Sequence, residues 1–414
     1  MTGSAASRRN AHLTYQGNTG VGRHGWLRLT PAYSVRLVRD HVARLAPGSV
    51  VTDPFSGTGT TALAAVEQGL SAQALDINPF LVWLGRAKTR HYPADSCHRA
   101  AALADAACRA ATAGLTGRRA GRVPAGVRLP PLANIERWWA PGPLHALALL
   151  RTRLDEIEPG GERDLLDLAF CRALIETSNA AFDHQSMSFR PDAEPRHHPE
   201  RVVELFAAHA TEILASAAVG LPGDATIINA DSRDMDAPAL APCDLLFTSP
   251  PYVNRMSYIR ELRPYMYWLR HLDAPGEAAD LDWSAVGGTW GTATSRLATW
   301  QSTEDLPIEE QLRPVCHRIA QDRGRSGPLL ATYVRRYFTD IWSHLQAAYK
   351  HVKSGGKATY IVGNSTFYGH VVPAQDWYRR LLLEAGFAAV RVETIRKRNS
   401  KKELFEFDVT AHKP

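Results

Sequence analysis

The sequence of 414 residues has no apolar run that reaches the roughly eighteen residues needed for a membrane-spanning helix. Its opening stretch, MTGSAASRRNAHLTYQ, lacks the apolar core of a signal peptide, so we expect a cytoplasmic protein with no membrane partner. The five cysteines are scattered and form no Cys-x-x-Cys pair. Their spacing argues against a disulfide framework and against a cysteine zinc site, and we predict no bound metal.

Charge and apolar content are those of a globular protein. Apolar residues make up 45% of the chain and charged residues 22%, which suffices for one large core or two smaller ones. The formal net charge of +6 permits a polyanionic partner without requiring one. Basic residues gather between positions 90 and 130 and in RKRNSKKE at 396–403. Taken alone, such stretches are as often solvated helix faces and loops as contacts to nucleic acid.

Strand and helix patterns alternate at the start of the chain. GSVVTDPFSGTGTTALAAVEQGL indicates a β-branched strand at about 49–53, a glycine-bearing turn and an alanine-rich helix. SAQALDINP then indicates a second short strand that ends at Asp76. After a long stretch with helical spacing, ATIINADSRD and CDLLFTSPPY return to strand patterns. A helix at about 373–385 and two strands, AAVRVETI and ELFEFDVTAH, complete a predicted α/β fold.

The turn DPFSGTGTT carries the first chemical signal. Gly57 and Gly59 allow the backbone to approach a ligand closely. Asp76, at the end of the next strand, is placed to accept hydrogen bonds from ribose hydroxyls. Asp53 would repel a phosphate but suits the ammonium group of an amino acid. S-adenosylmethionine matches both carboxylates, although a lone Gly-x-Gly is as often a plain strand-to-helix turn.

The apolar strand CDLLFT ends in a rigid tip formed by Ser249, Pro250, Pro251 and Tyr252. Because neighbouring parallel strands end at one crevice, this tip would lie beside the glycine turn. The prolines fix φ and leave carbonyl acceptors, Ser249 adds a side-chain oxygen, and Tyr252 supplies a flat face for a base. We therefore predict that the tip holds an exocyclic amine with its nitrogen lone pair towards a methyl donor.

In these motifs the sequence resembles the amino-group DNA methyltransferases, which modify cytosine N4 or adenine N6. DPFSGTGTT is similar to their F-x-G-x-G motif, ALDINP to their ribose-contact segment and TSPPY to their [DNS]-P-P-[YFW] catalytic motif. HGWLRLTPAYSVRLV, residues 24–38, resembles the segment that closes over the methionine end of the cofactor. These motifs imply an α/β, Rossmann-like, seven-stranded class I methyltransferase sheet, parallel except for one strand near the carboxyl end, with an inserted helical subdomain.

The resemblance also implies roles for individual positions. The cofactor would contact Asp53 with its amino group, Asp76 with its ribose and Asp231 with its adenine edge. Phe55, Gly57 and Gly59 would line it. The target amine would be held by Ser249, Pro250, Pro251 and Tyr252. A serine that opens the S-P-P-Y motif is commoner in N4-cytosine enzymes, so we favour cytosine N4. Adenine N6, or an amine of RNA or protein, is the alternative.

The resemblance further implies how the methyl group moves. No Pro-Cys nucleophile motif typical of the C5-cytosine enzymes occurs, so we predict direct transfer to nitrogen without a cysteine adduct. Pairing hides the target amine, so the base must be flipped from duplex DNA or be single-stranded already. A nucleic-acid-binding protein that keeps only a relict cofactor pocket is a further hypothesis from another class.

Two insertions interrupt the predicted core. We expect core segments at 1–90, 223–272 (with the S-P-P-Y motif) and 329–414, a helical insertion at 91–222 and a second, poorly patterned insertion at 273–328. The arginine-rich loop Arg118–Arg128 and the polar stretch Thr289–Gln301, which contains Trp290 and Trp300, are both candidates for reading DNA. Either insertion could instead contact a restriction or defence-system partner.

Overall fold

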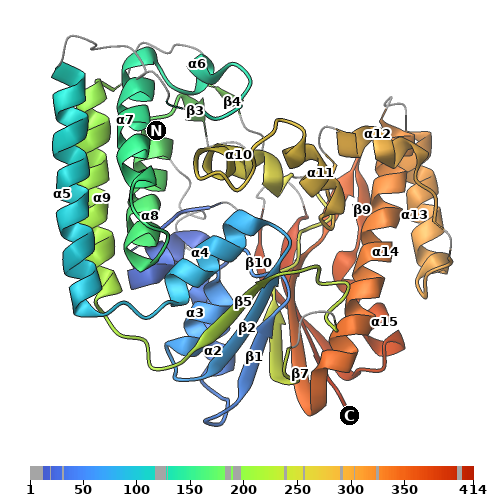
Figure 1. The fold of residues 1–414 in the computed structure, drawn as a ribbon. Helices are drawn as coiled ribbons and strands as arrows, with labels where there is room; N and C mark the ends of the chain where they lie inside the picture. The colour runs from blue at the N-terminus through green and yellow to red at the C-terminus, as the bar shows by residue number, and fades with distance from the viewer. Residues whose placement is uncertain are drawn as a thin grey trace.

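A computed structural model of the chain describes residues 13–18, 20–29, 32–116, 127, 129–181, 188–189, 197–236, 240–254, 257–289, 292–302, 304–322, 326–398 and 403–414. Within these residues the main sheet has the strand order β5, β2, β1, β6, β7, β11, β10 (Figure 1). The bounds are β1 (Val50–Asp53), β2 (Ser71–Asp76), β5 (Ala225–Asn229), β6 (Cys243–Thr248), β7 (Val352–Gly363), β10 (Ala388–Lys397) and β11 (Phe405–His412).

The strand directions confirm the predicted fold class. β5, β2, β1, β6 and β7 pair in parallel with their neighbours, whereas β11 runs antiparallel to both β7 and β10. One reversed strand near the carboxyl end of an otherwise parallel sheet is the arrangement expected of a class I methyltransferase sheet. The Rossmann-like sheet is therefore built from segments at both ends of the chain.

Helices cover the two faces of the sheet. α2 (Val35–Val42), α3 (Thr60–Val66) and α4 (Pro79–Thr89) contribute to the core on one face, and α14 (Gly327–His351) and α15 (Ala374–Glu384) to the core on the other. In β6, Leu245 and Phe247 belong to the first core, whereas Leu246 belongs to the second. Strand side chains alternate between faces, so a central strand covered on both sides has a continuous apolar run.

A block of helices stands beside the sheet (Figure 1). It contains α5 (Ala94–Thr116), α6 (Ile135–Trp138), α7 (Pro141–Asp155), α8 (Gly161–Glu176) and α9 (Pro199–Ala217), with a short hairpin of β3 (Ala180–Ala181) and β4 (Ser188–Phe189). α5 buries Ala100, Ala104, Ala107 and Ala111, whose spacing places them on one helix face. Small side chains on that face let α5 pack closely against α7 and α9. α10 (Tyr258–Trp268), which follows the Ser-Pro-Pro-Tyr tip, shares this core.

Residues 273–328 are more regular than we predicted. They contain α11 (Glu277–Ser284), α12 (Thr292–Thr299) and α13 (Glu309–Gln321). In α13, Leu312, Val315 and Ile319 are buried at helical spacing and belong to the core that includes α14. The expectation of a poorly patterned segment was wrong because these helices are short and Pro314 inside α13 weakens the helical signal.

Besides the β3–β4 hairpin, three short features were not predicted. They are the hairpin of β8 (Ser365–Phe367) and β9 (His370–Val372) and the 3-10 turns η2 (Tyr15–Asn18) and η3 (Gly22–Gly25). Elements of three or four residues are too short to leave a periodic pattern. In the part of the chain that the structure describes, no helix combines the length and the apolar character that crossing a bilayer requires.

Candidate functional site

The sheet order reverses between β1 and β6, since the chain continues to β2 and β5 on one side and to β7 on the other. Such a switch point opens a crevice outside the carboxyl ends of the strands. β1 ends there at Asp53, and β6 ends at Thr248. The Thr248 hydroxyl donates a hydrogen bond of 2.6 Å to Asp53 Oδ1. The glycine turn and the Ser-Pro-Pro-Tyr tip therefore both leave the sheet at one hydrogen-bonded junction.

Asp53 lies beneath this junction and is only 1% exposed. Besides the bond from Thr248, its carboxylate accepts hydrogen bonds from Phe55 N at 3.1 Å and from the Tyr33 hydroxyl at 3.1 Å. Burial raises the pKa of Asp53 above its usual value. Thr61 also hydrogen-bonds this carboxylate, so protein groups occupy nearly all of its about four acceptor positions.

The glycine turn is shaped by the helix behind it. Gly57 and Gly59 have φ values of +51° and +74°, in the left-handed region that glycine adopts without strain. A Cβ at Gly59 would lie 3.1 Å from the Cα of Gly85 in α4. From the same helix, Lys88 Nζ donates a hydrogen bond of 3.0 Å to the carbonyl of Thr58. Lys88 is 1% exposed, and burial lowers its pKa to about 7.

Asp76 ends β2 beside the glycine turn. Its Oδ2 accepts a hydrogen bond of 2.8 Å from Gly57 N, and its Oδ1 accepts one of 2.9 Å from Asn78 N. Burial raises the pKa of Asp76 to about 7. The residue is nevertheless partly exposed, so the remaining lone pairs can accept hydrogen bonds from ligand hydroxyls.

Phe55 follows β1 and Asp231 follows β5, at the same edge of the sheet. The Phe55 ring packs edge-on against the His344 ring with centroids 4.8 Å apart, and His344 Nδ1 donates to the carbonyl of Ser232 at 2.9 Å. Asp231 precedes Ser232 in the loop after β5, and Arg233 binds both of its oxygens, at 3.0 Å from Nε and 2.6 Å from Nη2. Asp231 would therefore meet an adenine edge as half of an ion pair rather than as a lone carboxylate.

Ser249 and Pro251 of the tip are hydrogen-bonded to β7 and α14. The Ser249 hydroxyl donates to the carbonyl of Ile361 in β7 at 3.1 Å, and the Ser249 side chain also hydrogen-bonds Tyr252. The carbonyl of Pro251 accepts a hydrogen bond of 2.7 Å from the Tyr337 hydroxyl in α14. Pro250, which lies between these two residues in the sequence, is buried. Of the acceptors predicted for an amine, the Pro251 carbonyl is thus already partly used.

The side chain of Tyr252 reaches β11. Its hydroxyl donates a hydrogen bond of 2.6 Å to Glu406 Oε1. The guanidinium of Arg398 lies over its ring, 5.1 Å from the centroid. Burial, and then the Glu406 carboxylate, raise the pKa of Tyr252 well above its usual value, so the phenol stays a hydrogen-bond donor. We call the residues predicted for the cofactor, at the ends of β1 and β2, the cofactor half of the site, and those predicted for the acceptor, after β6, the acceptor half.

Four residues of the site were not among those we predicted: Tyr33, Lys88, Thr248 and Glu406. Two of them lie inside stretches that the motifs cover, Tyr33 in TPAYSVRLV and Thr248 in TSPPY. The other two have no local signal, because Lys88 bonds a residue 30 positions away and Glu406 bonds one 154 positions away. Only the folded chain shows which of its many charged residues is buried at the site.

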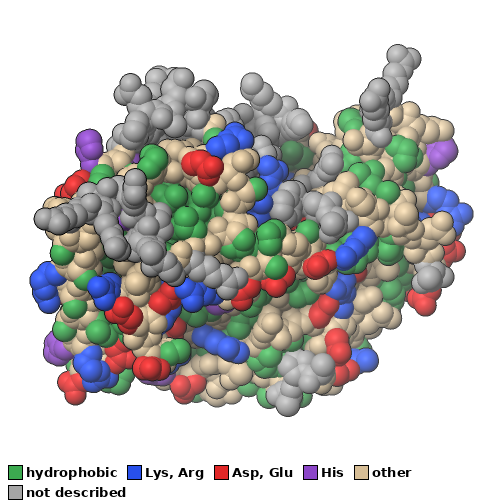
Figure 2. All heavy atoms as spheres, turned by 45° about the horizontal axis from the view of Figure 1, so that its top comes forward, with side chains coloured by type: hydrophobic (Ala, Val, Ile, Leu, Met, Phe, Trp, Pro, Cys, Tyr) green, Lys and Arg blue, Asp and Glu red, His purple; other side chains and the backbone are tan. Residues whose placement is uncertain are grey.

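The stretches that we expected to read DNA are described only in part. Arg118–Arg128, apart from Val127, and Trp290 lie outside the described residues. Trp300 follows α12 and is partly buried. Figure 2, in which the top of Figure 1 comes forward, shows basic and acidic side chains interspersed over this face. Among the described residues visible on this face, basic side chains are mixed with acidic ones rather than gathered into one stripe.

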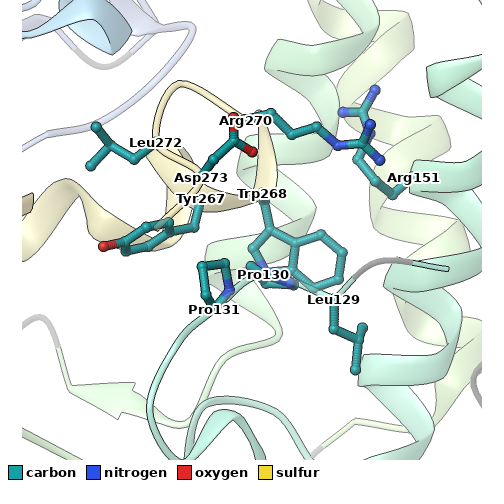
Figure 3. Close-up of a pocket in the computed structure, with 9 residues that line it drawn as sticks. All are labelled: Leu129, Pro130, Pro131, Arg151, Tyr267, Trp268, Arg270, Leu272 and Asp273. Carbon is teal, nitrogen blue, oxygen red and sulfur yellow. The ribbon is translucent and has the colours of Figure 1, made fainter. Parts of the chain in front are cut away.

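A small pocket lies away from the crevice, where the end of α10 meets α7 (Figure 3). Its lining includes Arg151 of α7, Trp268 of α10 and, after that helix, Arg270. Pro130 and Pro131 close it from a third segment. None of its lining residues is a predicted site residue, so we do not assign it to the cofactor.

The fold and the strand-end site define a protein with a class I methyltransferase sheet. No family model matches the sequence. A stretch of 69 residues is 35% identical to the Type II methyltransferase M.BsoBI of Geobacillus stearothermophilus, which corresponds to 16% of this chain and 14% of that relative. The chain therefore matches only a small part of that relative.

Solved structures were compared with the whole chain. The rRNA methyltransferase aviRa from Streptomyces viridochromogenes aligns over 92% of this chain and 86% of its own, with 11% identity and a TM-score of 0.28. A second structure of aviRa has 12% identity and a TM-score of 0.27. TM-scores this low do not establish a shared fold or function.

Proposed function

We propose that the protein is an S-adenosylmethionine-dependent DNA methyltransferase that transfers a methyl group to the exocyclic N4 amine of cytosine. The hydrogen bond between Thr248 and Asp53 carries this proposal, because it joins the turn suited to the methyl donor to the tip suited to the amine. The stretch that is similar to a Type II methyltransferase supports methyl-transfer chemistry. The serine of S-P-P-Y favours cytosine over adenine.

The residues at the ends of β1 and β2 fit the cofactor. Asp76 has carboxylate lone pairs at a partly exposed strand end, where ribose hydroxyls can donate to them. Gly57 and Gly59 present no side chain at two positions of the turn, where their φ values are positive. Asp53 would meet the α-amino group, and Asp231 with Arg233 would meet the adenine edge. When bound, S-adenosylmethionine supplies an electrophilic methyl group.

The residues after β6 would hold the acceptor. Ser249 and the proline carbonyls would accept hydrogen bonds from the amine and leave its lone pair towards the methyl group. Extruding a base from the duplex costs a few kcal/mol, and stacking on Tyr252 would return about 1–3 kcal/mol of it. Catalysis is then mainly positioning, which converts an encounter of two molecules into a reaction within one complex.

The cysteines support direct transfer to nitrogen. Burial raises the pKa of Cys108 to about 11 and the pKa values of Cys243 and Cys316 to about 12. It raises the pKa values of Cys97 and Cys171 as well. Thiols with raised pKa values are poor nucleophiles at neutral pH. Methylation of an amine needs no thiolate, since the nitrogen lone pair attacks the methyl carbon directly.

Expression in a host without DNA methylases tests the proposal, with mass spectrometry of the nucleosides from its DNA. We expect N4-methylcytosine. In the purified protein, Ser249→Ala and Tyr252→Ala should each lower methyl transfer about a hundredfold or more and leave the Kd for S-adenosylmethionine unchanged. Tyr368→Ala is the matched control, since Tyr368 is 45% exposed on the β8–β9 hairpin, and it should transfer at the normal rate.

Each other outcome refutes a different part of the proposal. N6-methyladenine instead of N4-methylcytosine would show that the base is wrong and keep the enzyme class. Labelled RNA or protein that outcompetes DNA would show that the acceptor is wrong. Calorimetry that detects no binding of S-adenosylmethionine would refute the enzyme and leave a nucleic-acid-binding protein with a relict pocket.

A further inference from the structure

The acceptor half of the site contacts a buried carboxylate that no motif includes. Glu406 lies in β11 opposite Gly363 of β7 and is 5% exposed. Its Oε1 accepts the hydrogen bond of 2.6 Å from the Tyr252 hydroxyl. Arg396 of β10 donates to Oε2 from Nε at 2.7 Å and to Oε1 from Nη2 at 3.3 Å. Hydrogen bonds to a carboxylate that is ion-paired in this way are strong.

The plane of the Tyr252 ring is set by other neighbours. The hydroxyl of a tyrosine lies close to the axis about which its ring turns, so the bond to Glu406 determines where the far end of the side chain sits but not how the ring is rotated. Arg398 places its guanidinium over the ring, 5.1 Å from the centroid. At Gly363 an added Cβ would lie 3.0 Å from Tyr252 Cδ2 and 2.7 Å from Arg398 Cζ. The absence of a side chain there lets the two stack.

We propose that Glu406 is a positioning residue, which acts through the Tyr252 hydroxyl to hold the ring where the target base stacks. This inference rests on the proposed function, since Tyr252 is the base platform only if the protein methylates a base. Arg396 pairs with Glu406, and Arg398 covers one face of the ring, so a base stacks on the other face. The hairpin of β10 and β11 thereby becomes part of the acceptor site.

The other role open to Glu406 is to neutralise Arg396 and stabilise the hairpin, without any effect through Tyr252. A double-mutant cycle separates the two roles, since a residue that acts through a hydroxyl has nothing to act on once that hydroxyl is removed. We would measure kcat and KM with tritiated S-adenosylmethionine and unmethylated duplex DNA for the wild type, Glu406→Leu, Tyr252→Phe and the double variant. Chemical denaturation of each protein would show that it is folded.

We expect Glu406→Leu to lower kcat about 10- to 100-fold, as befits loss of a bond to a charged acceptor, and to leave KM for S-adenosylmethionine unchanged. In the Tyr252→Phe background the same substitution should change kcat by less than about twofold. Glu406→Gln keeps an acceptor oxygen and should lose less than Glu406→Leu, which provides a second comparison if the leucine variant does not fold.

Asp408→Asn is the matched control. Asp408 lies two residues further along β11, so its side chain is on the same face, but it bonds His41 and Thr410 at 3.2 and 2.6 Å instead of Tyr252. Its kcat should be normal. A Glu406 effect of equal size in both backgrounds, or an equal loss in Asp408→Asn, would overturn the positioning role alone. A wild-type protein that transfers no methyl group would instead refute the proposed function.

Discussion

The pH at which S-adenosylmethionine binds should report the protonation of Asp76. Ribose hydroxyls donate to a carboxylate, so the cofactor binds the ionised form of Asp76 better. With a pKa of about 7, about nine-tenths of the Asp76 carboxyl groups are ionised at pH 8 and about one-tenth at pH 6. A pKa raised by burial means that a proton must leave before the ligand binds. The affinity should therefore increase as the pH rises through 7.

The size of the effect follows from these fractions. The Kd should be about tenfold higher at pH 6 than at pH 8, which corresponds to about 1.4 kcal/mol. Titration calorimetry at pH 6, 7 and 8, at constant ionic strength, measures it. Asp76→Asn removes the charge-assisted acceptor, worth about 1.5–3 kcal/mol. This variant should bind about 10- to 100-fold more weakly than the wild type at pH 8 and lose the dependence on pH.

Asp244→Asn is the matched control for this experiment. Asp244 lies near the start of β6, at the opposite end of the strand from the site. It accepts hydrogen bonds of 2.8 Å from Lys353 Nζ and from Val50 N. Its loss should leave the Kd for S-adenosylmethionine and its dependence on pH unchanged. A wild-type Kd that is constant from pH 6 to pH 8 would contradict the reasoning. So would an Asp76→Asn variant with the full dependence on pH, because another group would then be responsible.

Two further predictions concern glycines of the site. Gly59→Ala should lower the free energy of unfolding by about 1–2 kcal/mol because of its left-handed backbone, and by a further amount because the added Cβ approaches Gly85. Gly355→Ala is the control: its φ is +79° and nothing lies within 4 Å of an added Cβ, so it should lose only the backbone contribution. Equal losses in urea unfolding would mean that the approach to α4 does not matter. Gly363→Ala should lower kcat and leave the Kd for S-adenosylmethionine unchanged, because its Cβ would displace Tyr252, 3.0 Å away at Cδ2. A normal kcat in labelled-methyl assays would rule out that displacement.

Local patterns in the sequence predicted the elements that build the core of the site. The apolar run of β6 indicated a strand buried on both faces, and Leu245 and Leu246 do belong to opposite cores. DPFSGTGTT indicated a glycine turn, and both of its glycines have positive φ. These predictions depend on residues close together in the chain, where propensity, periodicity and turn geometry act directly. The short helices of 273–328 were missed because their patterns are brief and one contains a proline.

The sequence by itself determined the alternation of strands and helices, the left-handed turn and the polar residues at the strand ends. Only the tertiary structure decided which distant residues contact the glycine turn and the strand ends. Lys88 supports the glycine turn, and Glu406 holds the hydroxyl of Tyr252, across separations of 30 and 154 residues. Such contacts arise when the sheet brings strand ends together, and they leave no periodic trace along the chain. A buried lysine and an exposed one are identical in the sequence, because burial is a property of the whole fold.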